Sequence, residues 1–173
     1  MKLIECTEEK HAASIIDIFN HAIVNSTALF DYKPRSIESM KPWFEVKRKN
    51  NFPVIGIEDG GNNLLGFVSY GTFRGWPAYK YSVEHSVYVH HEYRKKGIGD
   101  LLLASIVEKA IEQNYHLLIG GIEATNLASI KLHQKHGFTH SGTITQAGYK
   151  FGRWLDVAFY QLILRTPNAP IDG

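Results

Sequence analysis

The sequence predicts an α/β domain built around a mixed β-sheet. Apolar residues at helical spacing alternate along the chain with short runs rich in β-branched and aromatic residues. The composition, with 44% hydrophobic and 21% charged residues, is typical of a globular protein with a substantial core. A length of 173 residues favours one domain rather than two. In order, the patterns predict β-α-α-β-β-β-α-β-α-β-β.

The first quarter of the chain contains one strand and two helices. We predict a short strand at Lys2–Cys6 and a helix over residues 10–26. Apolar side chains recur there at helical spacing, at Ala12, Ile15, Ile16, Phe19 and Ile23. A second, weaker helical stretch ends near Lys49, and either Ser36 or Ser39 could cap its start.

The middle of the chain is mostly β-structure followed by a long helix. Strands at Phe52–Ile57 and Leu64–Gly71 flank an Asp-Gly-Gly-Asn-Asn turn, whose residues accept the positive φ of a tight hairpin. A Val- and Tyr-rich strand is predicted at Tyr79–His90. A helix then runs from Ile98 to about Asn114. Its apolar stripe repeats every four residues, at Ile98, Leu102, Ile106 and Ala110.

The last third returns to strands around one short helix. A strand at Leu117–Ile122 leads to a helix that Thr125 or Asn126 can cap and that Gly137 ends. Two final strands are predicted around Phe138–Thr145 and Trp154–Leu164.

Composition also excludes several classes of function. A net charge of +2 argues against nucleic acid as the main partner. No apolar run approaches the ~18 residues of a membrane span, so we expect no membrane association. The single cysteine, Cys6, and the lack of a signal-like start indicate the cytoplasm.

Nine histidines raise the question of a metal site. His136 and His140 have the spacing of a helical ligand pair, but Gly137 between them is expected to end the helix. No Cys-x-x-Cys pair is present to build a zinc site. We therefore expect no metal.

The most informative segment is a basic, glycine-containing loop between a strand and a helix, Arg94-Lys95-Lys96-Gly97-Ile98-Gly99. First-turn N–H groups of a helix have no intrahelical acceptor, and glycines let a phosphate approach the backbone. The loop lacks the features of a Walker A or a dinucleotide motif. For Gly-x-Gly alone, a simple turn with solvated lysines is the commoner interpretation.

Arg94-x-x-Gly97-x-Gly99 resembles the acetyl-coenzyme A loop of the GNAT superfamily of N-acetyltransferases. Further segments resemble its phosphinothricin and methionine sulfoximine branch: Thr27–Asp31, Val83–Val89, Asn126-x-x-Ser129 and Gly148-x-Lys150-x-Gly152-x-Trp154-x-Asp156-Val157. The resemblance implies one acetyltransferase domain over residues 1–173, with a core of about 2–165 and a short tail. It also implies a mixed, mostly antiparallel sheet that is splayed at its centre and flanked by helices. The pantetheine arm would lie in the central gap of this sheet.

Glu84 is the candidate general base, because an amine attacks a thioester only when it is neutral. Strand alternation puts Glu84, Ser86 and Tyr88 on one face of their strand. The opposite face then carries Val83, His85, Val87 and Val89. The alternative is a rim carboxylate in a surface ion pair, and the resemblance favours the base.

The resemblance also implies a proton donor for the departing thiolate, seven residues after the asparagine of the later helix. That position is His133, about two turns beyond Asn126. The alternative is a solvated histidine with no part in the chemistry.

Two groups of contacts follow from the resemblance. Acetyl-coenzyme A, as co-substrate, would contact Val87, Tyr88, Val89, Arg94, Lys95, Lys96, Gly97, Ile98, Gly99, Asp100, Asn126 and Ser129. A small amino-acid substrate would contact Phe30, Tyr32, Arg74, Gly75, Trp76, Glu84, His85 and Ser86. Arg74 has the geometry to pair with a carboxylate through two hydrogen bonds.

The expected function is acetylation of the α-amine of a glutamate- or methionine-like amino acid, by direct transfer in a ternary complex. Alternatives are acetylation of protein amino termini or polyamines, and a non-catalytic acetyl-coenzyme A-binding module. A homodimer is expected. In one arrangement of it, residues 148–156 would complete a neighbouring subunit's site.

Overall fold

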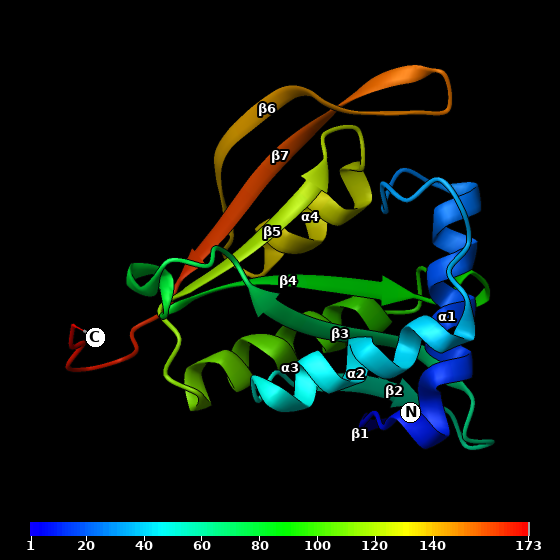
Figure 1. Ribbon diagram of the computed structural model, residues 1–173, viewed down its shortest axis with the longest axis horizontal. Helices are drawn as coiled ribbons and strands as arrows, with labels where there is room; N and C mark the ends of the chain where they lie inside the picture. Colours follow the sequence, from blue (N-terminus) through cyan, green and yellow to red (C-terminus); the bar gives the residue numbers. More distant parts are fainter. Residues whose placement is uncertain (173) are drawn as a thin grey trace. The chain divides into compact units, whose positions relative to one another are not determined.

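The computed structural model describes residues 1–172 (Figure 1). The order of its helices and strands confirms the order predicted from the sequence. They are β1 Lys2–Glu5, α1 Glu8–Asn25, α2 Met40–Lys49, β2 Val54–Glu58, β3 Leu64–Thr72, β4 Ser82–Val89, α3 Ile98–Glu112, β5 Leu117–Glu123, α4 Leu127–Lys135, β6 Thr139–Lys150 and β7 Arg153–Ile163. Three short 3₁₀ helices, which the sequence patterns did not predict, are η1 Ile37–Ser39, η2 Pro77–Tyr79 and η3 His91–Tyr93.

The strands form a 7-stranded sheet in the order β1-β2-β3-β4-β5-β7-β6. β4 and β5 are parallel, whereas β1–β2, β2–β3, β5–β7 and β6–β7 are antiparallel, which confirms a mixed, mostly antiparallel sheet. The chain forms two compact units. Unit 1 is Met1–Ser69 with Val87–Leu102, and unit 2 is Tyr70–Ser86 with the chain from Leu103 onward.

The start of α2 confirms the later of the two predicted helix starts. Ser39 directly precedes the helix, but neither Ser36 nor Ser39 caps it with its side chain. Instead, η1 gives Ser39 helical dihedral angles, and its hydroxyl donates to the carbonyl oxygen of Ser36 at 2.6 Å. Ser39 therefore lacks the extended backbone conformation from which an N-cap side chain normally accepts a first-turn N–H.

Aromatic side chains organise the core of unit 1. The ring of Phe19 in α1 meets Trp43, Phe67 and Tyr88 edge-on, with centroid distances of 5.9, 5.1 and 5.1 Å. The guanidinium of Arg35 lies over the same ring, 4.5 Å from its centroid. These contacts join α1, α2, β3 and the end of β4 within one unit.

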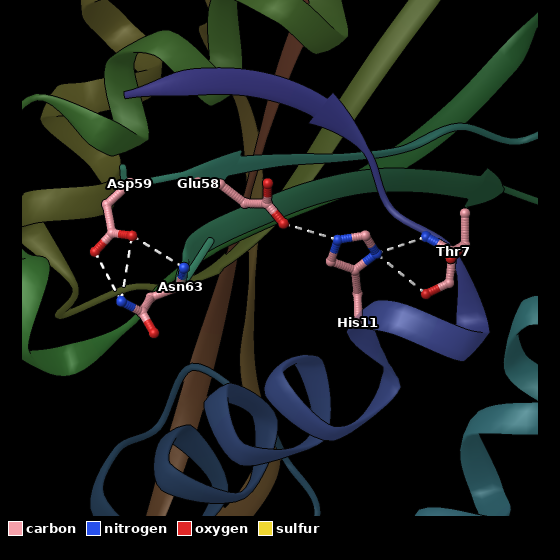
Figure 2. Close-up of polar contacts among 5 residues, drawn as sticks. All are labelled: Thr7, His11, Glu58, Asp59 and Asn63. Carbon is pink, nitrogen blue, oxygen red and sulfur yellow. Dashed lines mark hydrogen bonds and ion pairs between the residues drawn. The ribbon is translucent and has the colours of Figure 1, made fainter. Parts of the chain in front are cut away.

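A buried histidine links α1 to β2 in unit 1 (Figure 2). His11 Nδ1 accepts a hydrogen bond from the Thr7 N–H at 2.8 Å, and its Nε2 lies 3.0 Å from Glu58 Oε1. Both ring nitrogens are thus used inside the fold. Beside it, the Asp59 carboxylate accepts hydrogen bonds from Asn63 and closes the predicted β2–β3 turn. These hydrogen bonds lower the pKa of Asp59.

The ends of α4 resolve an open alternative. Asn126 caps the helix, with its side-chain oxygen accepting from the Ser129 N–H at 3.2 Å. Thr125 instead donates to Glu123 Oε2 at 2.6 Å. Gly137 follows the helix with φ +83°, as predicted for a residue that ends a helix.

The final hairpin is longer than predicted, because β6 continues to Lys150. Its turn consists of Phe151 and Gly152, both with positive φ, 51° and 74°. Such a two-residue turn suits the twist of a hairpin, but it normally uses Asn or Gly at both positions. Because Phe151 is not a usual turn residue, the sequence did not indicate a turn at this position.

Gly66 in β3 marks a close approach of two strands in unit 1. A Cβ there would lie 2.7 Å from the Tyr88 carbonyl oxygen and 3.1 Å from Val89 Cα. Because those atoms are backbone, they cannot move aside without shifting β4. We expect Gly66→Ala to lower the free energy of unfolding by about 1–3 kcal/mol, measured by chemical denaturation. Gly60→Ala is the control, because a Cβ there meets no other part of the described chain within 4 Å. Equal stability of both variants would contradict the close approach.

Candidate active site

The backbone pairing of β4 with β5 stops partway along both strands. The parallel register runs only from Ser82–Leu117 to Glu84–Ile119, although β4 continues to Val89 and β5 to Glu123. The sheet is therefore open beyond Glu84, as the resemblance implied.

Side chains of β4 alternate as predicted around this point. Val83 and His85 are 1% and 4% exposed, Glu84 is half-buried and Ser86 is exposed. The Glu84 carboxylate lies against β5, since its Oε1 is 3.1 Å from the position of a Cβ on Gly121. Burial raises the pKa of Glu84 above its ordinary value. A raised pKa makes this carboxylate a stronger proton acceptor.

On the other face of β4, His85 forms a hydrogen bond with His133 of α4. Their Nε2 atoms are 2.9 Å apart, and both side chains are buried. His133 Nδ1 lies 2.7 Å from the Ser129 carbonyl oxygen. Burial lowers the pKa of His85, and the neighbouring His133 lowers it further. Burial likewise lowers the pKa of His133. His133 is therefore not a solvated surface histidine.

The basic loop precedes α3 in unit 1. Lys95 and Gly97 have φ of +63° and +78°, whereas Lys96 between them is outside the positive range. Residues of alternating φ turn successive N–H groups toward one side, which is the geometry of an anion-binding nest. Apart from its chain neighbours, no residue of the described range 1–172 has an atom within 4 Å of a Cβ position on Gly97. The loop backbone is thus open to a phosphate.

The start of α3 adds helix amides to this loop. The N–H groups of Asp100 and Leu101 donate to the Gly97 carbonyl oxygen at 3.1 and 3.2 Å. Among residues 1–172, no such bond uses the N–H groups of Ile98 and Gly99. First-turn N–H groups and the helix dipole favour an anion at this position. The residues therefore fit a pyrophosphate.

The basic side chains of the loop also lie in unit 1. Arg94 Nε lies 3.5 Å from the Val89 carbonyl oxygen, and Lys96 Nζ lies 5.0 Å from the centre of the Tyr93 ring. Arg94, Lys95 and Lys96 are exposed. Their charges would add a general attraction for a phosphate group.

Three predicted substrate residues of unit 2 lie on the connection between β3 and β4. Arg74, Gly75 and Trp76 are exposed, and the Arg74 guanidinium lies 5.3 Å from the centre of the Phe73 ring. Within residues 1–172, Arg74 makes no ion pair with a carboxylate. An external carboxylate could therefore take that place.

Phe30 and Tyr32 lie in unit 1, between α1 and η1, where both are exposed, 38% and 73%. The ion pair between Arg35 and Asp31, with an Nη2–Oδ2 distance of 3.1 Å, stabilises this connection.

Two features of the site were not predicted from sequence. The contact between His85 and His133 joins residues 48 positions apart. It depends on Gly120, because a Cβ there would lie 3.0 Å from His85 Cε1 and 3.1 Å from His133 Nε2. The adjacent Gly121 gives room to the Glu84 carboxylate in the same way. The Gly-Gly pair inside an apolar strand was the one available signal.

Other classes of site receive no support from the described chain. Over residues 1–172, no group of three or more His, Cys, Asp or Glu side chains could hold a metal ion. Within the same range, every helix is too short or too polar to cross a membrane.

Comparison with known proteins yields a family match and several similar proteins. Residues 17–138 match the family described as acetyltransferase (GNAT). The chain is 40% identical over 157 residues to the L-methionine sulfoximine/L-methionine sulfone acetyltransferase of Pseudomonas aeruginosa, covering 90% of this chain and 91% of that one.

Solved structures extend the similarity to the whole fold. An Acinetobacter baylyi protein is 59% identical, with a TM-score of 0.98 over 99% of this chain and 96% of that chain. A GNAT superfamily phosphinothricin acetyltransferase from Sinorhizobium meliloti, solved with AcCoA, is 30% identical. Its TM-score is 0.93, over 98% of this chain and 91% of that chain.

Proposed function

The chain belongs to the acetyltransferase (GNAT) family, and on that premise we propose that it acetylates the α-amine of a small amino acid. It is an N-acetyltransferase that uses acetyl-coenzyme A. The names of its relatives favour methionine sulfoximine, methionine sulfone and phosphinothricin as substrates. The observation that carries this proposal is the half-buried Glu84 at the opening between β4 and β5, where its pKa is raised.

In the proposed reaction, Glu84 accepts a proton from the substrate ammonium, directly or through water, and so frees the amine for attack. Acetyl-coenzyme A supplies the activated acetyl group as a thioester. Backbone groups of Val87, Tyr88 and Val89 hold the pantetheine arm and stabilise the negative charge that develops on the carbonyl oxygen. The 94–100 loop holds the pyrophosphate, and Asn126 and Ser129 add contacts from α4.

The departing thiolate needs a proton, and His133 is the donor that the family resemblance implies. The hydrogen bonds of His133 bear on this role. Its Nε2 faces His85 and its Nδ1 faces the Ser129 carbonyl oxygen, so neither nitrogen is turned toward an outside group. A proton from solvent would serve the thiolate equally well, because a thiol has a pKa of about 8.5.

A thiol-release assay over a panel of amino acids, peptides and polyamines tests the proposed function. We expect turnover of methionine sulfoximine, methionine sulfone or phosphinothricin, and little with polyamines, which would need carboxylates rather than Arg74. Binding of acetyl-coenzyme A without turnover of any amine would identify a non-catalytic binding module instead. Preference for a peptide amino terminus would move the substrate class to proteins.

Arg74 is proposed to bind the substrate carboxylate, with Gly75, Trp76, Ser86, Phe30 and Tyr32 lining the site. We expect Arg74→Gln to raise KM for the amino acid about 10- to 100-fold, because a hydrogen bond to a charged group contributes about 1.5–3 kcal/mol. KM for acetyl-coenzyme A should not change. Arg165→Gln, at another exposed arginine, is the control. Unaltered KM in Arg74→Gln would remove Arg74 from the substrate site.

We also propose a homodimer formed through the β6–β7 hairpin, whose strands lie side by side (Figure 1). β6 is at the edge of the sheet, and its hairpin exposes apolar side chains: Ile144 54%, Tyr149 49%, Phe151 58% and Trp154 57%. Exposed edges and apolar patches of this kind are usually covered by a partner. Residues 148–156 would then reach the neighbouring site.

Light scattering after size exclusion measures the assembly. We expect a mass of twice 19.6 kDa for the wild type and 19.6 kDa for Trp154→Glu. A monomeric wild type would contradict the dimer.

We further propose a single domain over residues 1–173 and a reaction that needs no metal. We also propose a cytoplasmic location, with which the free, buried Cys6 is consistent.

A further inference from the structure

The buried histidine pair occupies the point at which β4 leaves β5. Backbone pairing ends at Glu84, and His85 is the next residue. Its ring reaches past Gly120 of β5 to His133 of α4, with an Nε2–Nε2 distance of 2.9 Å. Both rings also pack on Phe138, at centroid distances of 5.2 and 5.1 Å. The side-chain pair thus connects β4 with α4 directly after the last backbone pairing of β4 with β5.

The hydrogen bonds determine which nitrogen of each ring carries a proton. A carbonyl oxygen only accepts, so the 2.7 Å contact with Ser129 requires a proton on His133 Nδ1. In the neutral ring, His133 Nε2 is then an acceptor, and His85 Nε2 must donate to it. His85 Nδ1 carries no proton and makes no hydrogen bond to any atom of residues 1–172.

The surroundings keep this arrangement uncharged. Burial disfavours a charge on either ring, and His133 also opposes a proton on His85. The other groups that act on the pair are the Ser129 backbone, which raises the pKa of His133, His136, which lowers it, and the Ile119 backbone, which raises the pKa of His85. A neutral pair with defined tautomers has one geometry, which is what a positioning device requires.

We propose that His85 is a positioning residue for the acetyl transfer, acting through its hydrogen bond to His133. The bond holds β4 at its opening, so that the neighbouring Glu84 keeps its carboxylate against Gly121. His133 is the acceptor that completes this bond and is not the proton donor to the thiolate. This inference rests on the proposed function.

The test uses variants that separate shape, hydrogen bonding and proton donation. His85→Leu removes the donor, whereas His85→Gln keeps an N–H near the Nε2 position. His133→Leu removes the acceptor, whereas His133→Gln keeps an oxygen for His85 but has no proton to give as an acid. His140→Leu, at an exposed histidine of β6, is the control, and thermal melting confirms that each variant folds.

We expect both leucine variants to lower kcat by roughly 10- to 100-fold, with KM values changed by less than about threefold. The acidic limb of their pH–rate profiles should move toward the ordinary pKa of glutamate, since Glu84 becomes more hydrated. Both glutamine variants should keep kcat within about threefold of the wild type. The double variant His85→Leu/His133→Leu should be no slower than either single variant, because the two residues form one contact.

Other outcomes overturn the proposal. If His133→Gln loses as much kcat as His133→Leu and also loses the alkaline limb of the pH profile, His133 is the acid. If the leucine variants melt lower but keep kcat and the pH profile, the pair is a structural contact only. Imidazole ¹⁵N spectra of the wild type should show Nε2–H on His85 and Nδ1–H on His133. A wild type without turnover on the amino-acid panel would instead remove the proposed function, and the positioning role with it.

Discussion

Glu84→Gln is expected to lower kcat by roughly 10²–10⁴-fold, the usual contribution of a positioned general base. The substrate amine would then have no nearby group to take its proton. Affinity for acetyl-coenzyme A, measured by calorimetry, should be nearly unchanged, since the 94–100 loop is intact. Glu108→Gln, at an exposed carboxylate of α3, is the matched control and should keep the wild-type rate.

The pH dependence of the same variant supplies the sharper test. Glu84 accepts a proton only when it is ionised, so the wild-type rate should rise with pH through the pKa of Glu84. Because burial raises that pKa, the acidic limb should lie above the ordinary glutamate value of 4.5. Glu84→Gln should lose this limb. An acidic limb that is the same in both proteins would remove Glu84 as the base.

Glu84→Gln should not destabilise the protein. A raised carboxyl pKa means that the folded state binds the proton more tightly than the unfolded state does. The ionised carboxylate therefore lowers stability as the pH rises from the unfolded to the folded pKa, and this loss persists at neutral pH. Removing the charge should leave the melting temperature at neutral pH equal to or above that of the wild type.

The second large effect is expected from Gly97→Val, which should weaken acetyl-coenzyme A binding about tenfold or more. Gly97 has φ +78°, and an L-residue in this region costs about 1–2 kcal/mol, more for a β-branched side chain. Valine would also place carbon atoms in the open space where the pyrophosphate is proposed to bind. The two effects act on the same loop, so the loss should appear in the dissociation constant measured by calorimetry.

Gly60→Val separates a loop effect from a general one. Gly60 also has open space at its Cβ position but lies outside the positive-φ range, in the β2–β3 turn. It should bind acetyl-coenzyme A like the wild type. Equal affinity of Gly97→Val and the wild type would count against the loop as the pyrophosphate site.

Local patterns were sufficient to predict the helices and strands. The four-residue apolar repeat predicted α3, and Ile98, Leu102 and Ile106 are at most 1% exposed. Alternation in β4 correctly separated Glu84 from His85. Each of these signals is contained in a few consecutive residues, which is why sequence alone could carry it.

Contacts between distant segments could not be predicted in this way. His85 and His133 are 48 positions apart, and the sequence around either residue does not indicate their contact. The link between His11 and Glu58 spans 47 positions and was missed for the same reason. The β6–β7 turn was missed because Phe151 adopts a positive φ that its residue type disfavours. In each case the surrounding fold, rather than local preference, determines the geometry.

A crystal structure of the protein with acetyl-coenzyme A tests the central claim most directly. We predict the diphosphate within hydrogen-bonding distance of the amides at Gly97, Ile98 and Gly99, and the thioester carbonyl beside Glu84. Coenzyme A bound elsewhere, with no phosphate at the start of α3, would contradict the account.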